Sequence, residues 1–158
     1  MGSVFEVVVR TLGERGVTVE DIAGIVLEIQ KGYYPELTLD ECAASVTSVI
    51  KKREVQHAVL TGIALDVLAE RGFLPEPLQT IVREDNFLYG VDEILALAIT
   101  NVYGSIGLTN FGYLDKTKPG LIGRLDRGGP DKVNTFLDDL VAGLAAAAAA
   151  RIAHQREA

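Results

Sequence analysis

The sequence has little of what several classes of protein depend on. Cys42 is its only cysteine, so no disulfide can form within the chain. Because Cys42 follows Asp40 and Glu41 in a helical pattern, without electropositive neighbours, we expect a small core residue rather than a reactive thiol. Basic residues number 15 against 22 acidic ones, which gives a net charge of -7. That balance argues against a nucleic-acid binder and against electrostatic docking on an anionic membrane.

Targeting signals and long apolar runs are also missing. The first residues, Met1 to Val4, have neither the basic region nor the apolar stretch of a signal peptide. The longest weakly apolar run, from Leu140 to Ala150, is mostly alanine and has about half the length that a spanning helix needs. We therefore expect no transmembrane segment and a cytoplasmic protein, peripheral at the inner face of the membrane if its substrate is a phospholipid.

What is present is the composition of an ordinary globular protein. Of the 158 residues, 48% are hydrophobic and 23% are charged, which suits one domain spanning residues 1–158. No window alternates apolar and polar residues between hairpin signals, so no sheet is expected. The run 4–9 is rich in β-branched residues, yet its continuation to Gly16 fits a helix better. The sequence predicts an all-α, single-domain bundle of about six to eight helices.

Helix starts carry a repeated signature, in which a threonine stands three residues before an acid. It occurs at Thr18 to Asp21, Thr38 to Glu41 and Thr135 to Asp138, where each threonine can cap a new helix and each acid can reach back to the cap. With the apolar periodicity, these starts predict helices at 4–15, 18–31, 38–53, 54–71, near 78–82, 91–103 and 135–156. The stretch 104–134 has many glycines and no clear periodicity, so it is expected to be an ordered functional loop.

The last predicted helix is unusual because it is built from alanine. Between residues 143 and 150, Leu144 is the only bulky side chain. Alanine favours the helix and lets neighbouring backbones approach closely, so this Ala-rich C-terminal helix is expected near the centre of the bundle. An exposed alanine-rich tail is the alternative interpretation.

Some polar residues fall where the pattern indicates core. Asp66 shares a helical stripe with Val55 and Val59, and Asn101 shares one with Ile94. A buried carboxylate is costly unless hydrogen bonds or a metal compensate it, so Asp66 is either a structural or a functional acid. The sequence leaves the roles of Asp66 and Asn101 open.

Two adjacent acidic pairs, Asp92-Glu93 and Asp138-Asp139, each open an apolar helix. Helix capping would need one acid at such a start, but not two. On facing helices the two pairs could hold one or two Mg²⁺ ions, since magnesium combines a few carboxylates with water and phosphate oxygens. The segment between the pairs supplies cations that a phosphate would need and a glycine pair that permits close approach: Lys116, Lys118, Arg124, Arg127 and Gly128-Gly129.

These residues belong to four pieces that follow one another in order: Asp115-Lys-Thr-Lys118-Pro119, Leu125-Asp126-Arg127, Gly128-Gly129 and Leu137-Asp138-Asp139-Leu-Val-Ala-Gly143. Upstream, Asp85 precedes the Asp92-Glu93 pair in a D-x6-D-E element. Together they resemble the signature of the phosphatidylglycerophosphatase A family, and within it the soluble branch of YutG, also named low-temperature requirement C proteins. The chain departs from the membrane enzymes of that family, because it lacks their spanning helices and their N-terminal glycine-rich element.

The resemblance implies a Mg²⁺-dependent phosphoric monoester hydrolase that removes the terminal phosphate of phosphatidylglycerophosphate to give phosphatidylglycerol. Carried over to the matching positions, the metal ligands are Asp92, Glu93, Asp138 and Asp139. The catalytic acids are Asp138, Asp139, Asp126 and Asp115. Lys118 and Arg127 bind the substrate phosphate, and the charge pattern adds Arg124 to them. Water is the expected nucleophile, because neither His57 nor His154 lies in a motif.

Two other interpretations are open. One is a non-catalytic helical scaffold or regulatory protein of lipid metabolism or cold adaptation, which would need no metal. The other is an all-α nucleotide pyrophosphatase with similar acid-rich helices. Magnesium binding separates the enzyme from the scaffold. The Tyr33-Tyr34 pair and the small residues of the last helix leave room for a homo-oligomer of unspecified order.

Overall fold

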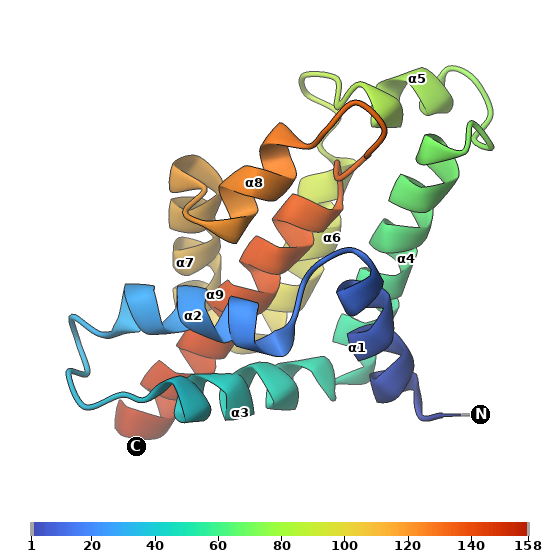
Figure 1. Cartoon of the computed structure of the whole chain (residues 1–158). Helices are drawn as coiled ribbons and strands as arrows, with labels where there is room; N and C mark the ends of the chain where they lie inside the picture. Colours follow the sequence, from blue (N-terminus) through green and yellow to red (C-terminus); the bar gives the residue numbers. More distant parts are fainter. Residues whose placement is uncertain (1, 158) are drawn as a thin grey trace.

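The computed structural model describes residues 2–157, and Figure 1 shows a bundle made of helices. Within these residues there is no β-strand, which confirms the expected all-α class. In chain order the helices are α1 (Val4–Glu14), α2 (Val19–Gln30), α3 (Leu39–Ile50), α4 (Arg53–Glu70), α5 (Leu78–Arg83), α6 (Val91–Thr100), the 3-10 helix η1 (Asn101–Tyr103), α7 (Gly104–Thr117), α8 (Leu121–Arg127) and α9 (Leu137–Glu157).

Local sequence sets several of the helix starts. Thr18 and Thr38 each form a complete capping box, as predicted, and Ser3 forms another with Glu6 that the threonine signature did not include. At the start of α3, the Glu41 amide donates to Thr38 Oγ1 at 3.2 Å, and the Thr38 amide donates to the Glu41 carboxylate at 2.8 Å. These reciprocal bonds satisfy backbone donors that a new helix leaves unpaired.

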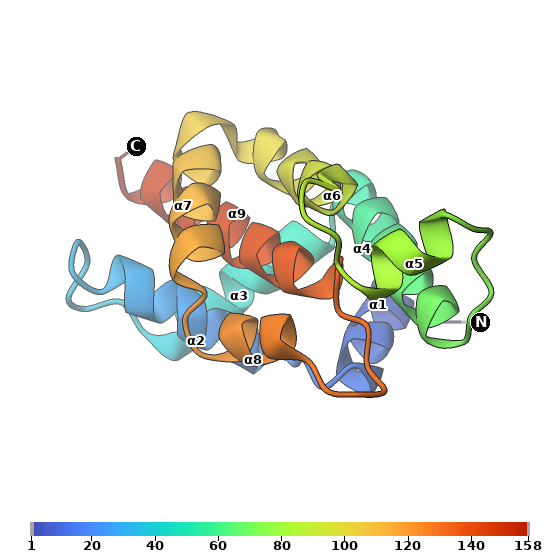
Figure 2. The ribbon, with the colours of Figure 1, turned by 90° about the horizontal axis from the view of Figure 1, so that it is seen from above.

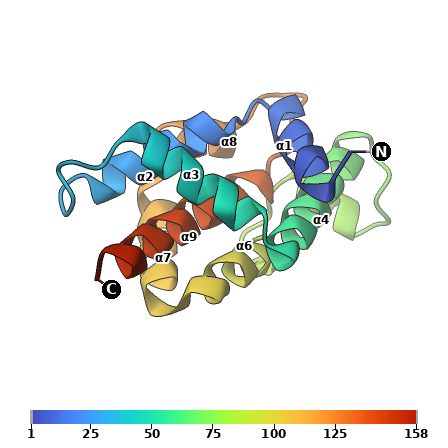
Figure 3. The same ribbon diagram turned by 90° about the horizontal axis from the view of Figure 1, so that it is seen from below.

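The alanine-rich helix α9 lies at the centre of the bundle, as predicted. Figure 3 shows it between the α2–α3 pair and the α6–α7 pair, and every side chain from Ala145 to Ala150 is fully buried. Its small residues let other helices approach closely, since a Cβ on Gly143 would lie only 3.1 Å from the Ala96 carbonyl oxygen of α6. The alternative of an exposed alanine-rich tail is therefore wrong.

The expected loop over residues 104–134 is wrong, because the structure places α7 and α8 within it. The glycines of this stretch suggest helix breaks, yet a Cβ on Gly107 would come 2.9 Å from the Thr100 carbonyl oxygen. Gly107 therefore serves close packing rather than a turn. Helix α7 also packs along α9, and this tertiary burial outweighs its weak local pattern.

The expected Thr135 cap of the last helix is also wrong. Helix α9 begins at Leu137, and Thr135 Oγ1 donates instead to the Val82 carbonyl oxygen at 2.6 Å. The Phe136 and Leu137 amides each donate to the carboxylate of Asp66 at 3.0 Å. Asp66 is fully buried on α4, so a carboxylate from a distant helix caps α9. This settles the role of Asp66 as structural.

Among the described residues one stretch, Val91–Thr117, is long and apolar enough to cross a membrane by length and composition. An 18-residue window of it has a mean hydropathy of 1.3, and 28% of that window is buried. The stretch consists of α6, η1 and α7, and both of its α-helices pack against α9. The absence of a transmembrane segment stays a prediction.

Candidate active site

A cavity of about 350 Å³ lies at one end of the bundle. The helix ends that contribute its lining residues are in the upper part of Figure 1. There the N-termini of α6 and α9 meet the C-terminus of α7 and the loop before α6, an arrangement that Figure 2 shows from above. Both predicted acidic pairs line the cavity, Asp92-Glu93 from the first turn of α6 and Asp138-Asp139 from the first turn of α9. Its other lining residues are Asp85, Asn86, Phe87, Leu88, Tyr89, Gly90, Asp115, Lys118 and Asp126.

Lys118 brings an ammonium group into the middle of the carboxylates. The residue ends α7 in the left-handed region, with φ 45, and its Nζ lies 3.4 Å from Asp115, 3.5 Å from Asp126 and 3.3 Å from Asp138. Burial lowers the pKa of Lys118, but the charges of Asp138, Asp126 and Asp115 outweigh burial and leave the pKa above its usual value. Lys118 is therefore charged and serves as a counter-ion for these acids.

Asp138 and Asp139 are 3% and 4% exposed, although adjacent acids normally face solvent. Burial raises the pKa of Asp138, and the attraction of Lys118 offsets only part of that effect. Burial also raises the pKa of Asp139, and the charge of Asp138 and hydrogen bonds with Asp115 and Asp92 raise it further. Burial and crowding therefore disfavour a negative charge on both carboxyls at the same time.

The loop between α5 and α6 forms the side of the cavity that sequence reasoning largely missed. Asp85 lines the cavity, and burial followed by the charges of neighbouring acids raises its pKa. Asp85 and Leu88 have φ angles of 49 and 65, which non-glycine residues rarely adopt. Tyr89 packs edge-to-face on Phe136, with 5.8 Å between the ring centroids. Only the D-x6-D-E spacing pointed to this loop, because its strained backbone leaves no local sequence signal.

The chemistry of the cavity fits a divalent cation. Its carboxylates greatly outnumber its ammonium group, and Asp138 Oδ1 is buried without a hydrogen-bond partner in the structure. Carboxylate oxygens are the ligands that Mg²⁺ prefers. As the side chains stand, no three Asp, Glu, His or Cys side chains within residues 2–157 converge to form a metal site, and Lys118 lies at the centre. A bound cation would share with Lys118 the neutralisation of these acids.

Two of the predicted phosphate-binding residues lie outside the cavity. Arg124 and Arg127 are exposed on α8 and do not line it. The Arg127 guanidinium lies over Gly123, with Nη1 3.3 Å from the place where a Cβ on that glycine would stand. Substrate binding by these two arginines stays a prediction.

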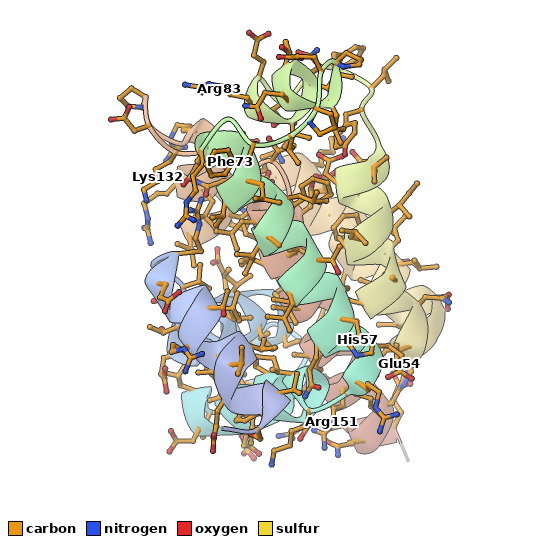
Figure 4. The ribbon with its side chains drawn as sticks, turned by 90° about the vertical axis from the view of Figure 1, so that its right-hand side faces the viewer. Glu54, His57, Phe73, Arg83, Lys132 and Arg151 are labelled. Atoms are coloured by element: carbon orange, nitrogen blue, oxygen red, sulfur yellow. The ribbon has the colours of Figure 1, made fainter. Side chains whose placement is uncertain are left out.

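Other residues considered in the sequence lie away from the cavity. His57 and His154 are both exposed, and Figure 4 shows His57 on the outer face of α4, near the end of that helix that is remote from the cavity. Asn101 is exposed in η1. Cys42 is fully buried, and burial raises the pKa of its thiol to about 11, which confirms an unreactive core residue.

The chain is similar to known proteins over the whole of the cavity and most of the bundle. A family model described as Phosphatidylglycerophosphatase A matches residues 8–154, which include every residue of the cavity. YpjQ of Bacillus subtilis (strain 168) is 57% identical over 157 residues, covering 99% of this chain and 88% of YpjQ. YutG of the same organism is 57% identical over 142 residues, covering 90% of this chain and 86% of YutG. The crystal structure of the low temperature requirement C protein from Listeria monocytogenes matches with a TM-score of 0.96 and 54% identity, covering 99% of each chain.

Proposed function

Because the chain belongs to the phosphatidylglycerophosphatase A family, as its motifs predicted, we propose that it is a Mg²⁺-dependent phosphatase of a phosphate monoester. The substrate that the family suggests is phosphatidylglycerophosphate, which would lose its terminal phosphate to give phosphatidylglycerol. One observation carries the proposal: Lys118 lies among Asp115, Asp126 and Asp138, beside the buried and unpartnered Oδ1 of Asp138.

Among the residues that line the cavity, the acidic pairs would hold the metal and Lys118 would hold the phosphate. Asp92, Glu93, Asp138 and Asp139 would hold Mg²⁺, because the first turns of α6 and α9 bring both pairs to one cavity. The N-terminal dipoles of the two helices favour acids at these positions. When bound, Mg²⁺ supplies positive charge that neutralises the phosphate and favours attack by water. Lys118 would bind a phosphate oxygen with its charged Nζ.

Hydrolysis also requires one proton transfer. The water oxygen bonds to phosphorus, the ester P–O bond breaks, and a proton passes from the water to the departing alcohol oxygen. Asp139 suits this transfer, because one of its carboxylate oxygens could hold the metal while the other accepts the proton from the water and passes it to the departing oxygen. Asp115 and Asp126 hold the Lys118 ammonium in place from the other side.

Phosphate release tests this proposal. We would measure release from phosphatidylglycerophosphate in mixed micelles with and without Mg²⁺, comparing the wild type with Asp138→Asn. The matched control is Asp40→Asn, which removes an exposed acid from the first turn of another helix. We expect Mg²⁺-dependent release by the wild type and by Asp40→Asn, and loss of release by Asp138→Asn.

Thermal unfolding with and without Mg²⁺ separates the alternatives. A metal ion that binds only the folded chain raises the free energy of unfolding by about 2.7 kcal/mol when its concentration is 100 times its dissociation constant. If Mg²⁺ stabilises the wild type but the lipid is not hydrolysed, the lipid substrate is wrong and soluble phosphate esters come next. If Mg²⁺ has no effect, the scaffold interpretation replaces the enzyme.

A further inference from the structure

The mouth of the cavity carries an exposed apolar surface, here called the apolar rim, made of Phe87, Leu88, Val91 and Ile94. Their exposed fractions are 93%, 85%, 42% and 61%, which are high values for large apolar side chains. The positions follow the end of the α5–α6 loop and then one face of α6. Apolar side chains that lie singly on a surface are common, but a contiguous group beside a cavity marks a contact site.

The backbone conformation of the α5–α6 loop keeps the side chains of the apolar rim exposed. Leu88 has φ 65, a left-handed conformation that costs free energy for a residue with a Cβ. Tyr89, the next residue, is fixed against Phe136, so the loop cannot simply fold its apolar side chains inwards. The strained backbone therefore keeps Phe87 and Leu88 in solvent at the mouth of the cavity.

Charge is absent from the stretch of chain that continues from the rim. From Ile94 to Leu114 the sequence has no charged residue, although the whole chain has a net charge of -7. Between Val91 and Ile94 in sequence stand Asp92, which is buried, and Glu93, which is exposed, and both line the cavity. None of the four rim side chains carries a hydrogen-bonding group that would specify a particular protein partner. The rim thus offers apolar contact without polar recognition.

Two of the rim residues also line the cavity that contains Lys118. A ligand with its phosphate at Lys118 would therefore have the rest of its length beside Phe87 and Leu88. For phosphatidylglycerophosphate, that remainder is a glycerol and a phosphodiester followed by the two acyl chains, which have to stay in an apolar phase while the headgroup enters the cavity.

We propose that the apolar rim docks on the surface of a phospholipid bilayer and presents the mouth of the cavity to lipid headgroups. This inference rests on the proposed function, since the lipid substrate is what selects a bilayer over a protein. Insertion of apolar side chains drives the docking, so it requires neither anionic lipid nor metal. Because no basic residue belongs to the rim, salt does not weaken the binding.

Vesicle sedimentation without Mg²⁺ tests the docking. Sucrose-loaded phosphatidylcholine vesicles are mixed with the full chain at low and high salt, and the pelleted fraction is measured. We expect the wild type to pellet equally at both salt concentrations. Phe87→Gln should reduce the partition by about tenfold, and Ile94→Gln by several-fold. Leu39→Gln is the matched control, because it makes the same change at an exposed leucine on α3, away from the cavity, and should pellet like the wild type.

Activity measurements separate failure of the docking from failure of the proposed function. Ile94→Gln should keep wild-type hydrolysis of a water-soluble phosphate monoester and lose several-fold in hydrolysis of phosphatidylglycerophosphate in vesicles. Vesicle binding by a wild type that hydrolyses neither substrate would support the docking and refute the phosphatase. A wild type that stays in the supernatant, or is released from vesicles by salt, overturns the docking. Conversion of a dimer to a monomer by Ile94→Gln, without vesicle binding by the wild type, also overturns it and assigns the rim to a second copy of the chain.

Discussion

Residues 137–150 of α9 are all buried, and the two halves of this stretch have opposite chemistry. At the N-terminal end, Asp138 and Asp139 are 3% and 4% exposed, and the carboxylate of Asp66 caps the helix. From Ala145 to Ala150 the same helix is fully buried and presents only methyl groups. Burial of methyl groups stabilises the folded chain, whereas burial of carboxylates destabilises it. Stability therefore accounts for the alanine half, and the acidic half requires a function that needs clustered oxygen ligands.

The largest loss of stability should follow from placing an acid in the alanine half. Ala146→Asp places an unpaired carboxylate in the fully buried alanine half, away from the Lys118 ammonium that neutralises the acids of the other half. We expect a loss of about 3–5 kcal/mol, enough to prevent folding of many domains of this size. Urea unfolding followed by circular dichroism measures it, with Ala146→Ser as the control. A variant as stable as the wild type would show that this half is not closely packed.

The next effect is the pH dependence of the free energy of unfolding that arises from Asp66, the cap of α9. Burial raises the pKa of Asp66 to about 7, and the Phe136 and Leu137 amides offset only part of that effect. Because the folded chain then holds a proton that the unfolded chain releases near pH 4, the free energy of unfolding should fall as pH rises between about pH 4 and pH 7, by up to roughly 1.4 kcal/mol per pH unit.

Asp66→Asn removes this titration and should make that part of the pH profile less steep, although Asp138 and Asp139 also contribute to the slope. Because the asparagine amide turns a donor towards backbone donors, the variant should also be less stable than the wild type, most of all near pH 5. Urea unfolding at several pH values measures both. An unchanged slope in Asp66→Asn would mean that Asp66 does not titrate in this range.

Asp139→Asn should separate function from stability. Removing one acid from the crowded cluster should stabilise the folded chain by about 1–2 kcal/mol, because burial and neighbouring acids disfavour its charge. The same change should lower Mg²⁺-dependent phosphate release by roughly 10²-fold. Thermal unfolding and the micelle assay give the two values. A variant that is less stable and fully active would reverse our assignment of the acidic half.

The smallest effect is expected where the halves join. Gly143→Ala would put a Cβ 3.1 Å from the Ala96 carbonyl oxygen, so α6 and α9 would have to separate slightly. The better helix propensity of alanine opposes this cost. We expect a net destabilisation of about 1 kcal/mol in urea unfolding. Stabilisation by the same substitution would show that α6 can shift without loss of packing.

Local patterns predicted the parts of the molecule that depend on local interactions. The capping boxes at Thr18 and Thr38 join residues three apart, and the central place of α9 follows from its alanines. The convergence of Asp92-Glu93 with Asp138-Asp139 was also predicted, because capping alone does not need two acids at each helix start. The family motif contributed Asp115, Lys118 and Asp126, whose meeting point depends on tertiary structure.

What could not be predicted depends on contacts between distant residues. The cap on α9 comes from Asp66, which lies 70 residues before Phe136 in sequence, so the nearer Thr135 was chosen wrongly. Helix α7 was missed because Gly107 looks like a break until Thr100 is seen packed against it. The left-handed Leu88 has no sequence signature, and with it the apolar rim was also missed.

The position of α9 in the chain determines when the protein can assemble. This helix contacts α2, α3, α4, α6, α7 and α8, all of which precede it in sequence. During translation the earlier helices therefore leave the ribosome before the helix that covers their apolar faces has been made. Until then the faces that α9 covers in the folded chain stay uncovered. The acidic cavity forms with the first turn of α9, so a nascent chain that still lacks this helix has no site that could bind metal or phosphate.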